Sequence, residues 1–319
     1  MSLQNENEYE DLLSLWSDLE SGLGVILGSP DSIQEFEPRV WQYDRWMRAL
    51  LRRDTDLGLY LLFQLATLSM VGYSASHALV SAVLCDLIAV ELKLPQAERD
   101  SLVHAALTMN IGMTALQDEL VGQIDKPSNE QQIAIRAHAV KGGLMLANMG
   151  VVDELWLDTV SLHHDETTGL GEYRDQAPAR RLARILRTVD RYGAMISPRK
   201  SREGRSATES MRALTSNLAR QNDEVGFALL HAVGLFPPGT FVRLENNEVA
   251  VVLRRSDHPN QPQVATLISA AGTPMNHPRL HQTTVGNPAI KAALAASSVR
   301  VHLNHHLILQ LGADTEERS

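Results

Sequence analysis

Several features are scarce in this sequence of 319 residues, and each scarcity excludes a class of protein. There is one cysteine, Cys85, so no disulfide can form within the chain and a reducing, cytoplasmic location is expected. Lys and Arg (29) are outnumbered by Asp and Glu (38), and the net charge of -9 argues against a DNA-binding protein. With 44% hydrophobic residues, the chain has an ordinary globular composition and can bury a sizeable core.

Long hydrophobic runs are also missing. No stretch of about 18 uncharged apolar residues occurs, so no membrane span is expected. The acidic start MSLQNENEYEDLL lacks the basic and apolar segments of a signal peptide.

Helical periodicity is present instead through most of the chain. Apolar residues recur every three or four positions up to about residue 235, which predicts a mainly α protein. We expect an N-terminal helical region at 1–69, a helical domain at 70–235 and a C-terminal region at 236–319. The first segment is either a small helical domain or the first layer of a larger bundle. Asp54 or Thr55 is a candidate cap for the third helix, and Ser128 with Gln131 forms a capping-box pattern.

The C-terminal region has a different pattern. Alternating β-branched residues flank Asn246-Asn247, which indicates a hairpin, and QVATLISAAG is a candidate third strand. The segment NPAIKAALAAS is expected to form the last helix. The fold class is therefore a helical bundle with a small C-terminal β-hairpin or meander.

Two groups of residues are expected to be structural. The four tryptophans lie at helical spacings typical of core or interface anchors: Trp16, Trp41, Trp46 and Trp156. His302, His305 and His306 have no carboxylate or cysteine close by in sequence, so we expect no metal ligands there.

A second set of histidines has a more informative placement. They lie, with one aspartate, on or at the ends of successive expected helices: His77, His138, His163, His164 and Asp190. A helical bundle can direct such side chains into one interior site. Imidazole nitrogen and carboxylate oxygen suit divalent Mn, Fe or Zn. Packing or surface histidines are the alternative interpretation.

At this point the sequence resembles a known family. The segments that carry the resemblance follow one another in the family's order: SASHALVSAVLCDLIAVEL, HAALTMNIGM, IRAHAVKGGLML, VSLHHDETTGLGEY and LARILRTVDRYGAMISPRKSR. They resemble the HD-GYP family, a branch of the HD superfamily of metal-dependent phosphohydrolases. The resemblance covers roughly residues 73–267. It implies a helical HD domain, a two-metal site and hydrolysis of cyclic di-GMP.

The chain departs from the family pattern at the site itself. The family's His-Asp pair is replaced by Met109-Asn110, and its following lysine by Met113. The GYP tripeptide becomes Gly171-Glu172-Tyr173. Two acidic positions are also changed, to Tyr73 and Thr168.

These departures change the expected metal chemistry. The resemblance makes the lost aspartate the bridge between two metal ions, and Asn110 offers no bridging anion. The first metal position, with His77 and Asp190, is expected to be weak or empty. His138, His163 and His164 form a second set, since three histidines plus water can hold one ion. We therefore expect either one divalent ion (Mn, Fe or Zn) or none.

The basic segment after Ala179 is a second candidate feature. By its spacing from Asp190, the resemblance places the family's phosphate-binding pair on Arg199 and Arg202. A solvated helix face that pairs with acids is the expected role of Arg180, Arg184 and Arg187.

Three functions follow from these observations. The preferred one is a degenerate HD-GYP-like signalling protein that binds a cyclic dinucleotide or a protein partner without turnover. The alternative is an active metal-dependent phosphodiesterase or phosphohydrolase. The third is a purely helical interaction module. Expected partners are cyclic di-GMP or another phosphorylated small molecule, signalling proteins such as diguanylate cyclases, and a second copy in a homodimer.

Overall fold

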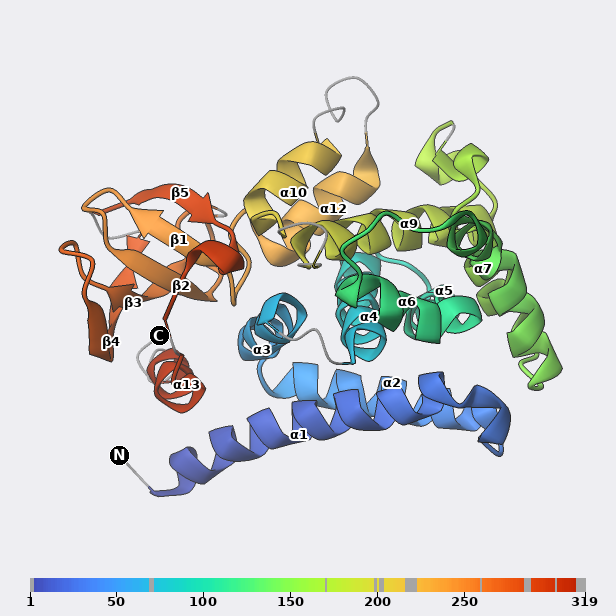
Figure 1. Cartoon of the computed structure of the whole chain (residues 1–319), viewed down its shortest axis with the longest axis horizontal. Coiled ribbons are helices and arrows are strands. Elements are labelled where there is room, and N and C mark those ends of the chain that lie inside the picture. The colour runs from blue at the N-terminus through green and yellow to red at the C-terminus, as the bar shows by residue number, and fades with distance from the viewer. Residues whose placement is uncertain are drawn as a thin grey trace.

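The protein is a helical bundle with a small antiparallel sheet at one end (Figure 1). The computed structural model describes residues 3–68, 72–169, 171–197, 200, 204–215, 223–258, 260–283, 288–301 and 303–313. The helices are α1 (Leu3–Gly28), α2 (Phe36–Arg53), α3 (Thr55–Leu68), α4 (Tyr73–Glu91), α5 (Gln96–Thr108), α6 (Thr114–Gly122), α7 (Asn129–Asn148), α8 (Glu154–Leu162), α9 (Pro178–Ile196), α10 (Ala207–Thr215), α12 (Glu224–Val233) and α13 (His305–Ala313). The short 3-10 turns are η1 (Pro30–Ser32), η2 (Ile111–Met113), η3 (Glu166–Gly169), η4 (Tyr173–Asp175) and η6 (Ala296–Ser298). The mainly α prediction is confirmed.

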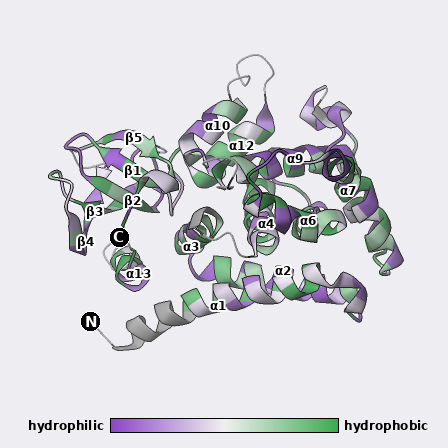
Figure 2. Cartoon of the chain, in the orientation of Figure 1, coloured by the Kyte–Doolittle hydropathy of each residue, from purple (hydrophilic) through white to green (hydrophobic). Residues whose placement is uncertain are grey.

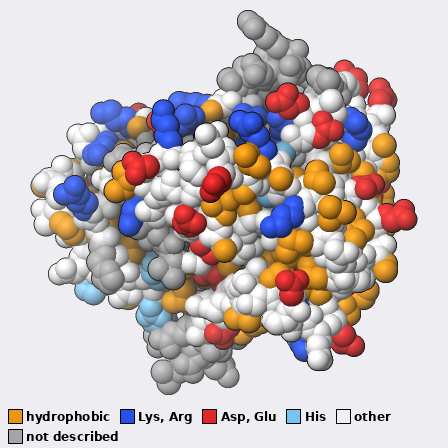
Figure 3. All heavy atoms as spheres, turned by 45° about the vertical axis from the view of Figure 1, so that its right-hand side comes forward, with side chains coloured by type: hydrophobic (Ala, Val, Ile, Leu, Met, Phe, Trp, Pro, Cys, Tyr) orange, Lys and Arg blue, Asp and Glu red, His pale blue; other side chains and the backbone are white. Residues whose placement is uncertain are grey.

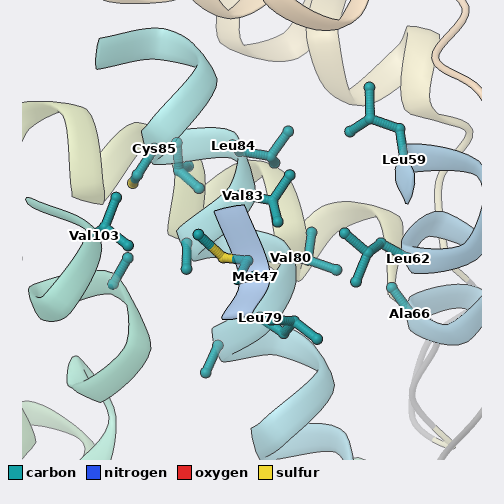
Figure 4. Packing of buried hydrophobic residues seen from close by; sticks show 14 of the residues in the cluster. Met47, Leu59, Leu62, Ala66, Leu79, Val80, Val83, Leu84, Cys85 and Val103 are labelled. Atoms are coloured by element: carbon teal, nitrogen blue, oxygen red, sulfur yellow. The ribbon is translucent and has the colours of Figure 1, made fainter. Parts of the chain in front are cut away.

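Helix α4 is the centre of the bundle. It packs against α1, α3, α5, α6, α9 and α12. It is long and apolar enough to cross a membrane, but 89% of its apolar window is buried inside the protein. Figure 4 shows its Leu79, Val83 and Leu84 among side chains from neighbouring helices. Burial by these helices accounts for its apolar sequence, as expected of a core helix.

The N-terminal helices share this core. One hydrophobic cluster contains Leu12 and Trp16 of α1, Met47 of α2, and Ile308 of α13. In Figure 2 both hydrophilic and hydrophobic residues recur along α2 and α7, as expected of helices with one face inward. The proposed boundaries near residues 70 and 235 stay a prediction, because the core runs continuously across them.

Local signals in the sequence explain where helices begin. The side chain of Asp54 accepts a hydrogen bond from Leu57 N (3.0 Å) at the start of α3. The Ser128 hydroxyl accepts from Gln131 N, and the Gln131 side chain accepts from Ser128 N, so α7 begins with the expected capping box.

The C-terminal sheet has the strand order β4-β3-β2-β1-β5, and every pairing is antiparallel. Its strands are β1 (Phe241–Leu244), β2 (Val249–Arg254), β3 (Gln263–Ile268), β4 (Pro274–Gln282) and β5 (Ile290–Leu294). The hairpin at Asn246-Asn247 and the third strand are confirmed, and Asn247 has the positive φ (68°) that such a turn needs. Helix α13 contacts the sheet and α1.

The expected helix at NPAIKAALAAS is wrong. Residues Ile290–Leu294 form β5, which pairs with β1 as an edge strand. Alanine and leucine favour a helix locally, but pairing with β1 satisfies the backbone of this segment in the folded chain. The last described helix is α13.

One face of the bundle is unusually apolar. Figure 3 brings forward the side that carries α7, and hydrophobic side chains gather there. Ile133, Val140 and Leu144 of α7 are exposed and lie seven and four residues apart, so they share one face of the helix. Helix α7 thus presents an apolar stripe to solvent.

Candidate metal and phosphate site

The five residues singled out in the sequence lie together. His77 comes from α4, His138 from α7 and Asp190 from α9, while His163 and His164 directly follow α8. These helices meet because α4 and α8 both pack on α9, and α7 packs on α8. The site is a cavity of about 160 Å³. It is lined by Tyr73, His77, Asn110, Met113, Gln117, Leu120, Ile135, His138, His164, Asp190 and Ala194.

Three histidines form a preorganised cluster. One nitrogen from each of His138, His163 and His164 lies within 4.8 Å of the others. The Nδ1 atoms of His138 and His163 face the carbonyl oxygens of Ile135 and Val160 (2.6 Å for the latter). A carbonyl only accepts, so each Nδ1 carries the proton and each Nε2 presents a lone pair.

The two lone pairs of this cluster face each other. His138 Nε2 lies 3.3 Å from His163 Nε2. Two lone pairs at this distance repel, and a cation bound to both relieves the repulsion. Two nitrogen ligands of a tetrahedral ion at about 2.0–2.1 Å from the metal are about 3.3 Å apart. The second expected metal position therefore has a donor set that fits a divalent ion.

Burial keeps these ligands neutral. It lowers the pKa of His138 and His164, and it lowers the pKa of the fully buried His163 to about 3. The neighbouring imidazoles act in the same direction on His138 and His163. Neutral imidazole is the form that binds metal, so no proton has to leave at neutral pH.

The two residues of the first expected metal position bind each other. His77 Nε2 donates to Asp190 Oδ1 (2.9 Å), and the ring of Tyr73 stacks on His77 with centroids 5.5 Å apart. Asp190 Oδ2 lies 3.9 Å from His164 Nε2, so the carboxylate connects the two halves of the site. Burial acts to raise the pKa of Asp190, but the His77 hydrogen bond and the nearby histidines outweigh it and hold the pKa below its usual value.

Two carboxamides line the same cavity. Asn110 lies between α5 and η2, and Gln117 lies on α6. The Oδ1 of Asn110 and the Oε1 of Gln117 are buried and accept no hydrogen bond from the residues that the structure describes. Buried oxygens of this kind normally have a donor or a cation as partner. Both can serve as hard oxygen ligands, but neither carries the negative charge of a carboxylate.

Sequence reasoning missed Gln117. It lies one helical turn after Met113, so the spacing alone places it near the same wall. Met109, by contrast, is fully buried and belongs to the hydrophobic core.

The loop that resembles the GYP motif contacts α9, the helix that carries Asp190. Gly171 adopts a positive φ (82°), which favours glycine, and Tyr173 is buried, which raises its pKa to about 12. The α9 arginines hold this loop. Arg184 donates to Gly171 O and Arg187 donates to Asp165 O, both at 3.1 Å.

The expected pairing of the α9 arginines with acids is therefore only partly correct. Arg184 does contact Asp223 (3.4 Å), but Arg187 donates to a backbone carbonyl and Arg180 donates to the Thr167 hydroxyl. The guanidinium groups of Arg184 and Arg187 reach backbone carbonyls because the loop that follows His164 packs against α9. Arg199 and Arg202, the expected phosphate-binding pair, lie outside the described residues.

The C-terminal histidines show other contacts. His305 pairs with the Tyr60 hydroxyl (3.0 Å), and His306 with Gln310 (3.0 Å). His302 lies outside the described residues.

Comparison with known proteins identifies the family of this chain. The HD domain family matches residues 61–224, just over half of the chain. The chain belongs to this family, as the resemblance predicted.

Two curated relatives refine the comparison. The chain is 29% identical over 247 residues to a cyclic di-GMP phosphodiesterase of Pseudomonas aeruginosa, covering 76% of this chain and 56% of the relative. It is 28% identical over 170 residues to a 3'3'-cGAMP-specific phosphodiesterase of Vibrio cholerae, covering 52% of this chain and 36% of the relative. The chain thus spans about half or less of these relatives. No solved structure matches it.

Proposed function

We propose that this HD-domain protein holds one divalent metal ion and binds a cyclic dinucleotide, with impaired hydrolysis, as a module of cyclic di-GMP signalling. The observation that carries the proposal is Asn110, a neutral carboxamide where the family has its bridging carboxylate. The ion would be held by His138, His163 and His164. When bound, a metal of this kind supplies charge stabilisation at a phosphoryl group and a more acidic bound water.

The missing charges limit catalysis. Preorganised charge at the reacting phosphoryl group is usually a large part of rate acceleration. Asn110 and Met113 remove one anion and one cation from the family's arrangement, while His77 and Asp190 bind each other. The remaining residues can bind and orient a phosphodiester but lack much of the charge complement for its cleavage.

The size of the cavity limits what enters it. About 160 Å³ is smaller than the roughly 300–1,000 Å³ of typical ligand pockets. One phosphodiester group fits, so the bases of a dinucleotide would lie outside this cavity.

The alternative is an active phosphodiesterase. It is supported by the retained set of neutral histidines with Asp190 and by the activities named for the two relatives. Metal content and turnover of the same sample separate the two functions.

The experiment measures metal per chain by mass spectrometry and the conversion of cyclic di-GMP to linear product. We expect one ion per chain, nucleotide binding and no product. Asn110→Asp, alone and with Met109→His, should raise the metal content toward two and produce turnover. If a histidine buried at position 109 prevents folding of the double variant, Asn110→Asp alone still tests the prediction.

A matched control makes the same chemical changes elsewhere. Met145→His with Asn148→Asp alters α7 outside the cavity and should change neither metal content nor turnover. Two ions and turnover in the unmodified chain would establish the active enzyme instead. Absence of nucleotide binding with one ion bound would leave a protein-interaction role.

The partner proposals have a separate test. An interaction with diguanylate cyclases stays a prediction, and the apolar stripe of α7 supports a homodimer. Leu144→Glu should convert a dimer to a monomer in light scattering after gel filtration, whereas an unchanged mass would exclude this face.

A further inference from the structure

A second cavity lies outside the HD site, between α1 and α2, which run side by side (Figure 1). Its volume is about 490 Å³. This volume is within the roughly 300–1,000 Å³ of small-molecule sites. None of the residues that line the HD cavity lines this one.

One face of each helix forms a wall of this cavity. Residues three and four positions apart share a helix face, and the lining residues of both helices follow this spacing. They are Gly22, Val25 and Ile26 of α1, and Arg39, Gln42, Tyr43 and Trp46 of α2. The segment between the helices adds Ser32, Ile33 and Gln34. A single stretch of the chain, residues 22–46, therefore builds the whole cavity.

A glycine brings the two walls together. A Cβ on Gly22 would overlap the Tyr43 hydroxyl and lie 3.2 Å from two carbons of the same ring. The Tyr43 hydroxyl therefore lies against Gly22, which lines the same cavity.

Apolar and aromatic groups form much of the lining. The rings of Tyr43 and Trp46 lie next to each other, with centroids 6.1 Å apart. Val25 is 66% exposed, although the next residue, Ile26, is buried. An apolar side chain beside two aromatic rings is a surface on which a further aromatic ring can pack.

Two polar groups of the cavity have hydrogen-bond donors to offer. The Tyr43 side chain is half-buried, and its hydroxyl makes no hydrogen bond with any residue that the structure describes. Arg39 lies one helical turn before Tyr43, and its charge acts to lower the pKa of that hydroxyl, while burial raises it. The Arg39 guanidinium donates to Gln42 Oε1 (3.3 Å) and makes no ion pair with the described residues. A guanidinium has five N–H donors, so most of them are available to a ligand.

The charge of this cavity has one sign. Arg39 is the one charged residue among the described residues that line it, and no carboxylate is among them. Asp31 and Glu35 are close in sequence but are exposed and do not line the cavity. A carboxylate entering the cavity would meet a cation, and carboxylates pair well with guanidinium groups through two parallel N–H donors.

We propose that this cavity binds a small aromatic carboxylate. The carboxylate pairs with the Arg39 guanidinium and accepts a hydrogen bond from the Tyr43 hydroxyl, and the aromatic body packs on Trp46 and Val25. The proposal is independent of the nucleotide function of the HD site, because the two cavities share no residue.

The test is calorimetric titration of the full chain with cinnamate and, separately, with its neutral counterpart cinnamyl alcohol. Cinnamate should bind more tightly than the alcohol, by about fivefold or more. Arg39→Gln should remove this preference and leave binding of the alcohol unchanged. Trp46→Leu should weaken both compounds several-fold, because both place a ring on the indole. Thermal unfolding of each variant checks that it is folded.

An exposed position of the cavity gives a second variant. Val25→Glu adds a carboxylate to the lining and should weaken cinnamate several-fold by repulsion, with less effect on the alcohol. Val25→Gln has the same size without the charge and should treat the two compounds alike. Because Val25 is largely exposed, neither substitution disturbs the core.

Two controls locate the ligand. Arg45→Gln removes one positive charge from α2 outside the cavity and should leave cinnamate binding unchanged. His138→Ala with His163→Ala removes metal ligands of the HD site and should also leave it unchanged, which excludes a carboxylate bound to a metal ion there.

Four results would overturn the proposal. Equal affinity for cinnamate and the alcohol would mean that no carboxylate is recognised. Equal weakening by the Arg39 and Arg45 variants would mean unspecific attraction to α2. Loss of cinnamate binding only in the histidine variant would place the ligand in the HD site. No binding of cinnamate at millimolar concentration would mean that the cavity does not take this class of ligand.

Discussion

His163 shows how burial prepares a side chain for metal binding. Its side chain is fully buried, and its Nδ1 proton is fixed by Val160 O, so the free lone pair is always Nε2. The same burial gives the metal-free protein a pH dependence. The folded pKa of about 3 lies below the usual 6.5 of the unfolded chain.

The sign of this pH dependence follows from proton counting. Between pH 3 and 6.5 the unfolded chain binds one more proton than the folded chain at His163. Stability is therefore fully present above pH 6.5 and is lost as the pH falls, by up to about 1.4 kcal/mol per pH unit. Urea unfolding of chelator-treated protein from pH 4 to 7 measures it. His163→Asn should give a shallower slope, and an identical slope would contradict the prediction.

Gly112 allows η2 to approach α7 next to the site. A Cβ at this position would lie 2.5 Å from His138 O and 3.0 Å from Gly142 N, so Gly112→Ala must separate the two segments. We expect a loss of about 1–3 kcal/mol of stability and a lower metal content, because His138 moves with its backbone. Gly122→Ala is the control, since nothing lies within 4 Å of its Cβ, and it should change neither quantity.

At the scale of elements, the start of α7 was predictable because its signal is local. Ser128 and Gln131 are three residues apart and exchange both hydrogen bonds of the capping box. Ser128→Ala should lower stability by about 1 kcal/mol in urea unfolding. Arg136→Ala, in the middle of the same helix, should have almost no effect, and an equal loss in both variants would argue against the cap.

Strand β5 shows the opposite case. Residues Ile290–Leu294 have a helical composition, and only the pairing with β1 makes them a strand. Trp41 illustrates the same limit on a helix. Its spacing within α2 predicted a core or interface anchor, and its exposed fraction of 41% rules out only the core position.

At the scale of the whole molecule, a buried ion pair ties the sheet to the bundle. Arg254 of β2 contacts Asp54 before α3 at 2.6 Å, and both are buried. Arg254→Ala leaves a carboxylate buried without its main cation, so stability should fall by about 3–5 kcal/mol.

An exposed pair on the same sheet is the comparison for this ion pair. Arg279 contacts Glu248 at 2.9 Å but is largely exposed. Arg279→Ala should cost less than about 1 kcal/mol in the same unfolding experiment. Similar losses of stability from both substitutions would mean that the buried Arg254 pair contributes no more to stability than an exposed pair.

The sequence by itself determined the helical class, the helix starts at Asp54 or Thr55 and at Ser128, and the set of histidines and aspartate that meet in the bundle. These follow from periodicity, capping and ordered motifs, which are local or family-wide signals. Only the tertiary structure decided that His77 binds Asp190 while His138 and His163 turn lone pairs toward each other. It also decided that α1 and α2 enclose a second cavity. Such contacts join residues far apart in the chain, and their geometry depends on how whole helices pack.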